Sequence, residues 1–295
     1  MSASYPKFAV IGALGQVGQE FTKHLRSERL VRLDLPDLDV ACLESVRNCL
    51  AGLEFDIAIN LAAFHQTDAC EDQPEHAFAV NAVGAGNVAR VCCELGRGVC
   101  FFSSDYVFGC DEQRSDPYFE GDQPGPVNAY GASKLAGEHL TRILNPRATI
   151  VRTSSLFGTQ TSHKGSTFPE KMIEKARSVD KLKVVSDQRM SPTYTYDLAA
   201  RTLAVLENGG TGVFHLSGGG ECSWWEFAVE AIRMSGHSAD IEPVSSEAFP
   251  TPARRPAYSR LDSRRLAKLG VPEMPHWKDG LRRYLGEKGL LEIDR

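Results

Sequence analysis

The chain has 295 residues, enough for one large domain or for a domain with a smaller lobe. Its 42% hydrophobic and 24% charged residues are the balance of a soluble globular protein. The formal net charge of -5 and the absence of a long apolar segment argue against a nucleic-acid-binding or membrane-spanning protein. A first strand that begins almost at the N-terminus, with no leader-like segment, predicts a cytoplasmic location.

Eight cysteines show neither a CxxC pair nor a histidine at zinc-finger spacing, so the sequence predicts no metal site. Five of them lie in apolar segments, where a free cysteine packs as a small hydrophobic residue. We expect these five to be reduced core thiols, as suits a reducing cytoplasm. They are Cys42, Cys49, Cys92, Cys93 and Cys100.

In the first half of the chain, short apolar runs alternate with helical patterns. The pattern predicts strands at 8–11, 30–33, 57–61, 99–102 and 148–152, and helices at 16–25, 41–50, 74–95 and 129–144. The strands are almost continuously apolar, as in a parallel sheet covered on both faces. Repeated strand-helix units predict an α/β fold with a doubly wound parallel Rossmann sheet and right-handed crossovers.

After Gly158 the pattern loosens into a polar loop at 159–165, followed by further elements. Helices are predicted at 169–177, 196–207 and 223–234, a strand at 183–186, and an irregular proline-rich stretch at 243–256. We therefore expect a dinucleotide-binding domain and a smaller C-terminal substrate-binding lobe. The domain would comprise residues 1–156 and 177–214, and the lobe residues 157–176 and 215–295.

Three glycines, Gly12, Gly15 and Gly18, follow the first strand at three-residue spacing. A turn from a strand into a helix needs glycine where the backbone approaches a pyrophosphate, and the helix then points free N–H groups at the phosphates. The position between the first strand and the first helix favours a dinucleotide site over a tight turn without a ligand. The predicted cofactor contacts in this turn are Gly12, Leu14, Gly15, Gln16 and Val17.

Asp34 ends the second predicted strand. A carboxylate there can accept hydrogen bonds from both hydroxyls of the adenosine ribose and would repel a 2'-phosphate, which favours NADH over NADPH. Arg32 would point the same way in a regular strand and soften that repulsion. We expect NADH or NADPH as cofactor, with NADH preferred; the alternative is a surface aspartate in a turn.

Tyr130 and Lys134 share one face of a predicted helix, because they are four positions apart. The lysine is expected to lower the pKa of the phenol from about 10. Tyr130 can then give a proton to a carbonyl oxygen as hydride reaches the carbon, and Lys134 can bind the nicotinamide ribose. Ser104 lies at the carboxyl end of the fourth strand, where open sheets bind ligands, and its hydroxyl can orient the carbonyl.

Seven stretches of the chain resemble the extended short-chain dehydrogenase/reductases and, more narrowly, the dTDP-4-dehydrorhamnose reductase family. They are GALGQVG (12–18), NLAAFHQTDACEDQPEHAFAVNA (60–82), FFSSDYVFG (101–109), NAYGASKLAGE (128–138), VRTSSLFG (151–158), DQRMSPTYTYDLA (187–199) and RRPAYSRLD (254–262). In that family a hydroxyl of the SxDYVF segment, a tyrosine and a lysine form the catalytic set. The resemblance implies this role for Ser104, Tyr130 and Lys134.

The resemblance also implies positions around both ligands. On the cofactor side, Leu61, Ala62 and Ala63 would line the nicotinamide–adenine groove, and Asp39 and Val40 would flank the adenine. On the substrate side, the sugar nucleotide would be approached by Ser104, Asp105, Tyr106, Ser155 and residues 187–193, and its diphosphate by Arg255.

Three positions depart from the family pattern. Ser155 stands where the family usually has a tryptophan near the sugar, Met190 replaces a glycine and Thr167 an asparagine. These changes are expected to alter the pocket around the sugar and not the hydride chemistry, with Met190 a candidate to fill the space of the missing indole. Trp224 and Trp225 are expected to pack in a core, and His65 and His163 to be solvated or internally bonded.

The sequence thus predicts an NAD(P)H-dependent reductase of a nucleotide-activated 4-keto-6-deoxy sugar, converting dTDP-4-dehydrorhamnose to dTDP-rhamnose, as a monomer or homodimer. One alternative is a nucleotide-sugar epimerase or dehydratase that keeps its NAD bound. A dehydratase would normally have a glutamate after Asp105, where Tyr106 stands. Another is a non-catalytic regulatory relative, which the retained Tyr130 and Lys134 disfavour.

Overall fold

The centre of the protein is a sheet of six parallel strands in the order β10-β5-β4-β3-β1-β2. The computed structural model describes residues 5–160, 165–179 and 181–292. The sheet strands are β1 (Phe8–Ile11), β2 (Leu30–Leu33), β3 (Ile57–Asn60), β4 (Gly98–Ser104), β5 (Ala148–Thr153) and β10 (Gly212–His215). This is the predicted doubly wound Rossmann sheet, with β10 added at an edge.

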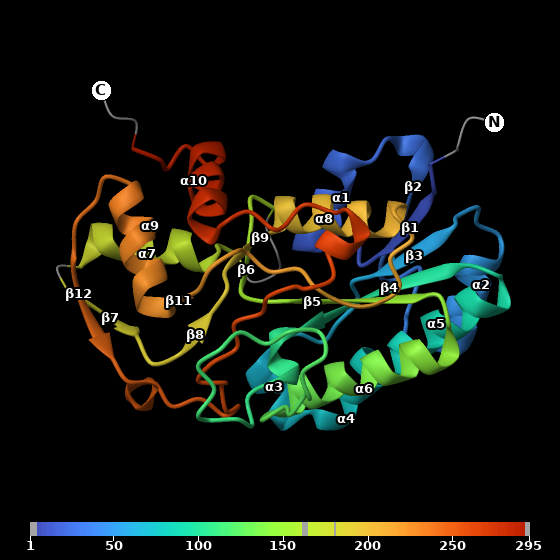
Figure 1. Cartoon of the computed structure of the whole chain (residues 1–295), viewed down its shortest axis with the longest axis horizontal. Coiled ribbons are helices and arrows are strands. Elements are labelled where there is room, and N and C mark those ends of the chain that lie inside the picture. The colour runs from blue at the N-terminus through green and yellow to red at the C-terminus, as the bar shows by residue number, and fades with distance from the viewer. Residues whose placement is uncertain (1–4, 161–164, 180, 293–295) are drawn as a thin grey trace.

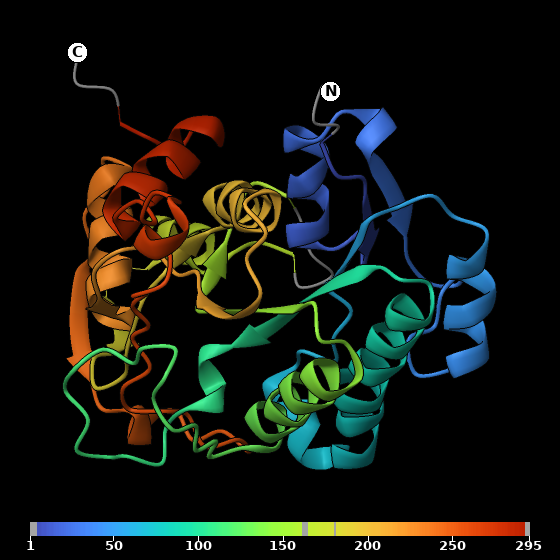
Figure 2. The ribbon, with the colours of Figure 1, turned by 45° about the vertical axis from the view of Figure 1, so that its right-hand side comes forward.

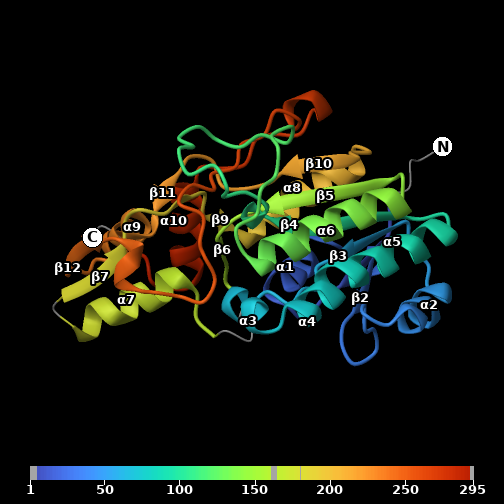
Figure 3. The same cartoon turned by 90° about the horizontal axis from the view of Figure 1, so that it is seen from below.

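Helices cover both faces of the sheet. In Figure 1, α1 (Gln16–His24) and α8 (Thr195–Glu207) lie above it, and α5 (Ala85–Glu94) and α6 (Ala129–Leu144) lie below it. Figure 3 shows α4 (Pro74–Phe78), α5 and α6 along one face, with α3 (Thr67–Asp72) and α2 (Leu43–Ala51) nearby. The predicted helix at 74–95 consists of α4, a π-helical segment (Ala79–Gly84) and α5.

Alternation along β1 shows why both faces need a cover. Phe8 and Val10 pack in one apolar cluster with Phe21 of α1, while Ala9 and Ile11 pack in another on the opposite face. Successive side chains of a strand point to opposite faces, so a continuously apolar strand is stable only between two layers.

A second group of elements packs around its own apolar cluster. It contains β6 (Leu156–Phe157), α7 (Phe168–Ser178), β7 (Lys181–Val185), β8 (Arg189–Met190), β9 (Thr193–Tyr194), β11 (Cys222–Ser223), α9 (Trp224–Met234), β12 (Asp240–Val244) and α10 (Trp277–Glu287). Phe157, Phe227, Leu281 and Tyr284 are among its fully buried side chains. Figure 2 shows most of these elements gathered on one side of the molecule.

The strand pairing of this lobe requires a correction to the predicted boundaries. The stretch 177–214 was assigned to the dinucleotide-binding domain, but β7 pairs with β12 and β8 pairs with β11. We propose that residues 181–194 belong with the C-terminal lobe, and that α8 and β10 belong with the sheet. The irregular stretch predicted at 243–256 begins with the end of β12.

All eight cysteines are free thiols, and Cys92 and Cys100 are buried as expected. The prediction is wrong for Cys42 and Cys93, which are exposed, and Cys49 is only partly buried. Neighbouring positions on a helix point about 100° apart, so Cys92 of α5 faces the core while Cys93 faces outward. In the described ranges, no helix has the length and apolar character needed to cross a bilayer.

Candidate active site

A cavity of about 420 Å³ lies at the carboxyl ends of β1, β3, β4 and β5. In open α/β sheets this edge is where ligands bind. Many of the predicted site residues line it: Gly12, Gly15, Gln16, Val17, Leu61, Ala63, Ser104, Asp105, Tyr106, Tyr130, Lys134 and Ser155. The sheet topology thus brings together residues from five separate segments of the sequence.

The glycine turn lines part of the cavity with backbone atoms. Gly12 has a positive φ of 82° and its N–H donates to Leu33 O at 2.9 Å. A Cβ at Gly18 would lie 2.3 Å from Gly12 O, so the turn and the first helix can meet this closely only without a side chain there. Gly15 caps α1 with no side-chain hydrogen bond, which leaves the first N–H groups of the helix to a ligand. This backbone cradle fits a dinucleotide pyrophosphate.

Asp34 joins the end of β2 to the glycine turn. Its Oδ2 accepts from Leu14 N at 2.7 Å and its Oδ1 from Leu35 N at 2.9 Å. Among the described residues, the lining of the cavity does not include Leu14, Asp34, Asp39, Val40 or Ala62. Asp39 is exposed, whereas Val40 is buried and packs against Gly84. Their contacts with the adenosine half of a cofactor stay predictions.

The start of α6 carries the two ionisable side chains of the site. Asn128 caps the helix by accepting Gly131 N at 2.8 Å, and Gly131 packs against Tyr106 O, where a Cβ would approach to 2.0 Å. Lys134 is buried with its Nζ 4.2 Å from the centre of the Phe101 ring. The Tyr130 ring meets Tyr106 edge-on at 6.0 Å. The capped, closely packed helix start fixes both side chains toward the cavity.

Burial is the largest influence on the pKa values of Tyr130 and Lys134. It raises the pKa of Tyr130, against the effect of a hydrogen bond with Ser104. Burial also lowers the pKa of Lys134 to about 7, with Glu138 the largest opposing influence. The expectation that Lys134 lowers the pKa of the phenol therefore needs correction, because burial of the phenol sets the direction of the shift and the hydrogen bond with Ser104 opposes it.

Ser104 is held in place by Asp105. The Ser104 hydroxyl lies 3.0 Å from Asp105 Oδ1 and accepts from Tyr106 N at 3.2 Å. Asp105 Oδ2 accepts from Ser154 at 2.8 Å and from Ser259 at 2.6 Å. Burial raises the pKa of this carboxyl group, and the three serine hydroxyls counter the shift. The carboxylate oxygens are thus engaged by serines and orient Ser104.

One turn beyond Lys134, a buried ion pair locks α6 to the sheet. Arg152 of β5 donates to both oxygens of Glu138, at 2.8 and 2.7 Å, and Ser103 of β4 donates to Oε1 at 2.5 Å. Arg152 also lies 3.4 Å from His215 Nε2, and burial lowers the pKa of that imidazole to about 4. The network fixes the register of α6 against β4 and β5.

Several residues predicted around the substrate make contacts within the protein, and the proposed contact of Arg255 with the diphosphate stays a prediction. Arg255 is paired with both oxygens of Asp68 at 2.8 Å, beside Tyr106 but outside the described lining of the cavity. Met190 is buried in the core of the C-terminal lobe, so it does not fill the space beside Ser155. Thr167 caps α7 and lies 2.5 Å from the Tyr284 hydroxyl. In the segment 187–193, Arg189 pairs with Glu221 and Glu226.

Sequence reasoning missed several lining residues, chiefly Trp224. Trp224 packs against the core of the C-terminal lobe, as expected, and it also lines the cavity from the first position of α9. The capping box Ser223–Glu226 marks the start of that helix in the sequence, yet nothing local shows which way the indole points. His65 also lines the cavity, with Thr67, Phe102, Ser103, Thr153 and Leu156. His163 lies outside the described residues.

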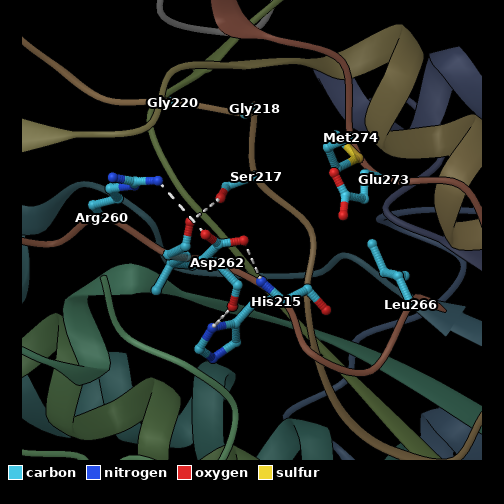
Figure 4. Close-up of a pocket in the computed structure, with 12 residues that line it drawn as sticks. His215, Ser217, Gly218, Gly220, Arg260, Asp262, Leu266, Glu273 and Met274 are labelled. Atoms are coloured by element: carbon cyan, nitrogen blue, oxygen red, sulfur yellow. Dashed lines mark hydrogen bonds and ion pairs between the residues drawn. The ribbon is translucent and has the colours of Figure 1, made fainter. Parts of the chain in front are cut away.

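A second cavity, of about 50 Å³, lies beyond the end of β10 (Figure 4). The Nδ1 of His215 is 3.1 Å from Asp262 O, and Arg260 pairs with the Asp262 carboxylate at 3.5 Å. This volume suits ordered water and is too small for a cofactor. In the described part of the chain, no cluster of three or more His, Cys, Asp or Glu could hold a metal ion.

Comparison with known proteins gives consistent matches along the chain. The model of the RmlD substrate binding domain matches residues 7–289. Spore coat polysaccharide biosynthesis protein SpsK of Bacillus subtilis is 37% identical, covering 96% of this chain and 98% of that protein. A dTDP-4-dehydrorhamnose reductase of Sinorhizobium fredii is 36% identical, with coverages of 95% and 96%. The crystal structure of dTDP-4-dehydrorhamnose reductase from Bacillus anthracis in complex with NADP aligns with a TM-score of 0.90 at 34% identity, covering 96% of this chain and all (100%) of that one.

Proposed function

Because the chain belongs to the dTDP-4-dehydrorhamnose reductase family of extended short-chain dehydrogenase/reductases, we propose that it uses NAD(P)H to reduce the keto group of a nucleotide-activated 4-keto-6-deoxy sugar. Two of its relatives are named dTDP-4-dehydrorhamnose reductase, so the proposed substrate is dTDP-4-dehydrorhamnose, which would become dTDP-rhamnose. The observation that carries the proposal is that one cavity contains both the glycine turn and the set Ser104, Tyr130 and Lys134.

In this proposal the residues of the chain divide the work. When bound, the cofactor supplies a hydride to the keto carbon. Tyr130 gives the phenol proton to the keto oxygen. The single hydroxyl proton of Ser104 is donated to Asp105 Oδ1 in the structure, and this hydroxyl would turn to donate to the keto oxygen when the sugar binds. Lys134, whose pKa lies at about 7, holds the ribose and stabilises the phenolate left behind. Tyr130 thus loses its proton only when the hydride has turned the keto oxygen into an alkoxide that takes this proton up.

The cofactor can be NADH or NADPH. The relative from Bacillus anthracis, which is 34% identical to this chain, was crystallised with NADP. That complex gives no support for the predicted preference for NADH. Asp34, joined to the turn through Leu14, is the residue whose carboxylate would meet a 2'-phosphate. The preference therefore rests on this one side chain.

The alternatives are weaker. An epimerase or dehydratase returns its hydride to the same sugar, and a dehydratase would need an acid where Tyr106 follows Asp105. A regulatory relative would have no need of a half-buried tyrosine and a buried lysine in the cavity. We propose further that the protein acts in the cytoplasm, because all eight of its thiols are free.

The test is to mix the purified protein with NADPH or NADH and dTDP-4-dehydrorhamnose and to follow the absorbance of the reduced cofactor. The expected result is a stoichiometric loss of reduced cofactor and formation of a dTDP-6-deoxyhexose. Absence of turnover with this and other dTDP-4-keto-6-deoxy sugars would overturn the proposal.

A further inference from the structure

Among the residues that the structure describes, the C-terminal lobe contributes Leu156, at its first position, and Trp224 to the lining of the cavity. Apart from Trp224, the described lining residues all come from the segment between Gly12 and Leu156. Trp224 is half-buried and opens α9, which packs on the lobe core through Phe227. The indole is therefore where the lobe meets the reacting part of the site.

The position of Trp224 is firmly held. In the capping box of α9, Ser223 Oγ accepts from Glu226 N at 3.1 Å and Glu226 Oε2 accepts from Ser223 N at 2.7 Å. The indole lies 4.8 Å from the Phe168 ring, which stacks on Phe227 at 5.6 Å. An aromatic side chain backed by other rings and fixed at its backbone presents a rigid apolar surface.

Its neighbour serves a different purpose. Trp225 donates its Nε1 proton to Ile241 O of β12 at 2.8 Å, so its polar edge is engaged within the lobe. Trp225 does not belong to the described lining of the cavity. Two adjacent indoles on one helix thus form a natural pair, one facing the cavity and one holding the lobe together.

The cavity has space for a ligand to pack against the Trp224 indole. Ser155, another lining residue, has a small side chain and a φ of 46°, an uncommon left-handed conformation for a residue other than glycine. Tyr130 lines the same cavity, and the sugar is the part of the substrate that must reach this phenol. A 6-deoxy sugar has an apolar ring face and a methyl group, which suit the face of an indole.

We propose that Trp224 is a specificity-determining residue that packs its indole against the 6-deoxy sugar ring, in a cavity that Ser155 leaves open. This inference rests on the proposed reductase function. It assigns to Trp224 the recognition of the sugar and not that of the nucleotide base. Removal of the indole should therefore weaken the use of the keto sugar while leaving the binding of dTDP alone unchanged.

The experiment compares Trp224→Ala and Trp224→Phe with the matched control Trp225→Phe. For each we would measure kcat/KM for dTDP-4-dehydrorhamnose, the inhibition constant of dTDP and the KM of NADPH. Trp224→Ala should lower kcat/KM on the order of 10- to 100-fold, with dTDP and NADPH binding retained. Trp224→Phe should recover part of the loss, and Trp225→Phe should behave as the wild type.

A loss of dTDP binding equal to the loss of kcat/KM would overturn the inference, and so would wild-type kinetics in Trp224→Ala. If Trp224→Ala does not fold, Trp224→Phe decides by the same criteria, with a smaller loss expected. A binding measurement separates this inference from the proposed function. Addition of dTDP-rhamnose should change the tryptophan fluorescence of the wild type and Trp225→Phe but not that of Trp224→Phe, even if no keto sugar is turned over. An equal fluorescence response in all three proteins would contradict the role of Trp224.

Discussion

Two successive turns of α6 bury ionisable side chains in opposite ways. At the first, Tyr130 and Lys134 face a cavity, and the Lys134 ammonium lies over the Phe101 ring. At the second, Glu138 is held by two hydrogen bonds from Arg152 and one from Ser103. Burial lowers the pKa of Lys134 to about 7, whereas Glu138 is matched by a cation of equal burial.

The difference separates a turn organised for chemistry from one organised for structure. A buried charge with a complete set of partners resists any change of protonation, because either partner alone would be left unpaired in a low dielectric. A buried amine with a pKa near neutrality changes its charge at little cost, which is a property of functional sites. The ion pair of Glu138 with Arg152 fixes α6 against the sheet and so positions Tyr130 and Lys134, one turn earlier in the same helix.

The largest expected effect is on turnover. Tyr130→Phe removes the proton donor and keeps the packing of the ring, so kcat should fall on the order of 100- to 10,000-fold. Steady-state kinetics would be measured beside thermal unfolding and NADPH titration, both of which should remain close to the wild type. Normal turnover in this variant would show that the first turn does not carry the chemistry.

Loss of the ion pair between Glu138 and Arg152 should lower the stability of the fold. Glu138→Gln leaves the Arg152 charge buried without its partner, which should lower the free energy of unfolding by about 3–5 kcal/mol. Urea denaturation would measure it, with Glu94→Gln as control because its pair with Arg47 is exposed to solvent and contributes little to stability. Equal losses in the two variants would contradict a structural role for the buried pair.

The buried amine should make stability depend on pH. The pKa of Lys134 is lowered from 10.5 in the unfolded chain to about 7 in the fold, so between these values the unfolded chain binds a proton that the folded protein lacks. The free energy of unfolding should therefore rise with pH over this window relative to Lys134→Met, and run parallel to it below the window. Denaturation of both proteins across the pH range measures the difference. A constant difference would mean that Lys134 keeps an ordinary pKa.

The smallest effect concerns the cofactor. Asp34→Ala should lower the ratio of kcat/KM for NADH to that for NADPH by about 10-fold, because it removes a ribose acceptor and relieves repulsion of the 2'-phosphate. The ratio is the readout, since loss of the bond from Leu14 N should weaken both cofactors. Asp34→Asn, which keeps an acceptor without the charge, is the control. An unchanged ratio in both variants would place Asp34 away from the ribose.

The fold was predictable where a single strand or helix carries the whole pattern. The bounds predicted for β1 and α6 agree with the structure because continuous apolar runs and helical spacing are local properties. The strand β10 has four residues with only Val213 and Phe214 apolar and buried at its centre, too short to stand out. The strand β12 contains Pro243 and is defined by pairing with β7, which lies far away in the sequence.

The candidate site divides in the same way. Glycine spacing and the Tyr130–Lys134 spacing are local, and the residues they indicate line the cavity together. The direction of the Trp224 indole, the pairing of Arg255 with Asp68 and the burial of Met190 depend on tertiary packing between distant segments. Burial also sets the pKa directions of Tyr130 and Lys134, which spacing alone cannot supply.

The most direct test of the central claim is to follow the transferred hydride with NADPH that carries deuterium at the reactive position of the nicotinamide. With dTDP-4-dehydrorhamnose as substrate, a reductase that protonates the ketone through Tyr130 should place the deuterium on the former keto carbon. One NADPH should be lost for each product formed, and Tyr130→Phe should do this far more slowly. Product that forms without net loss of NADPH, or without deuterium at that carbon, would contradict the account and indicate an epimerase or dehydratase that recycles its cofactor.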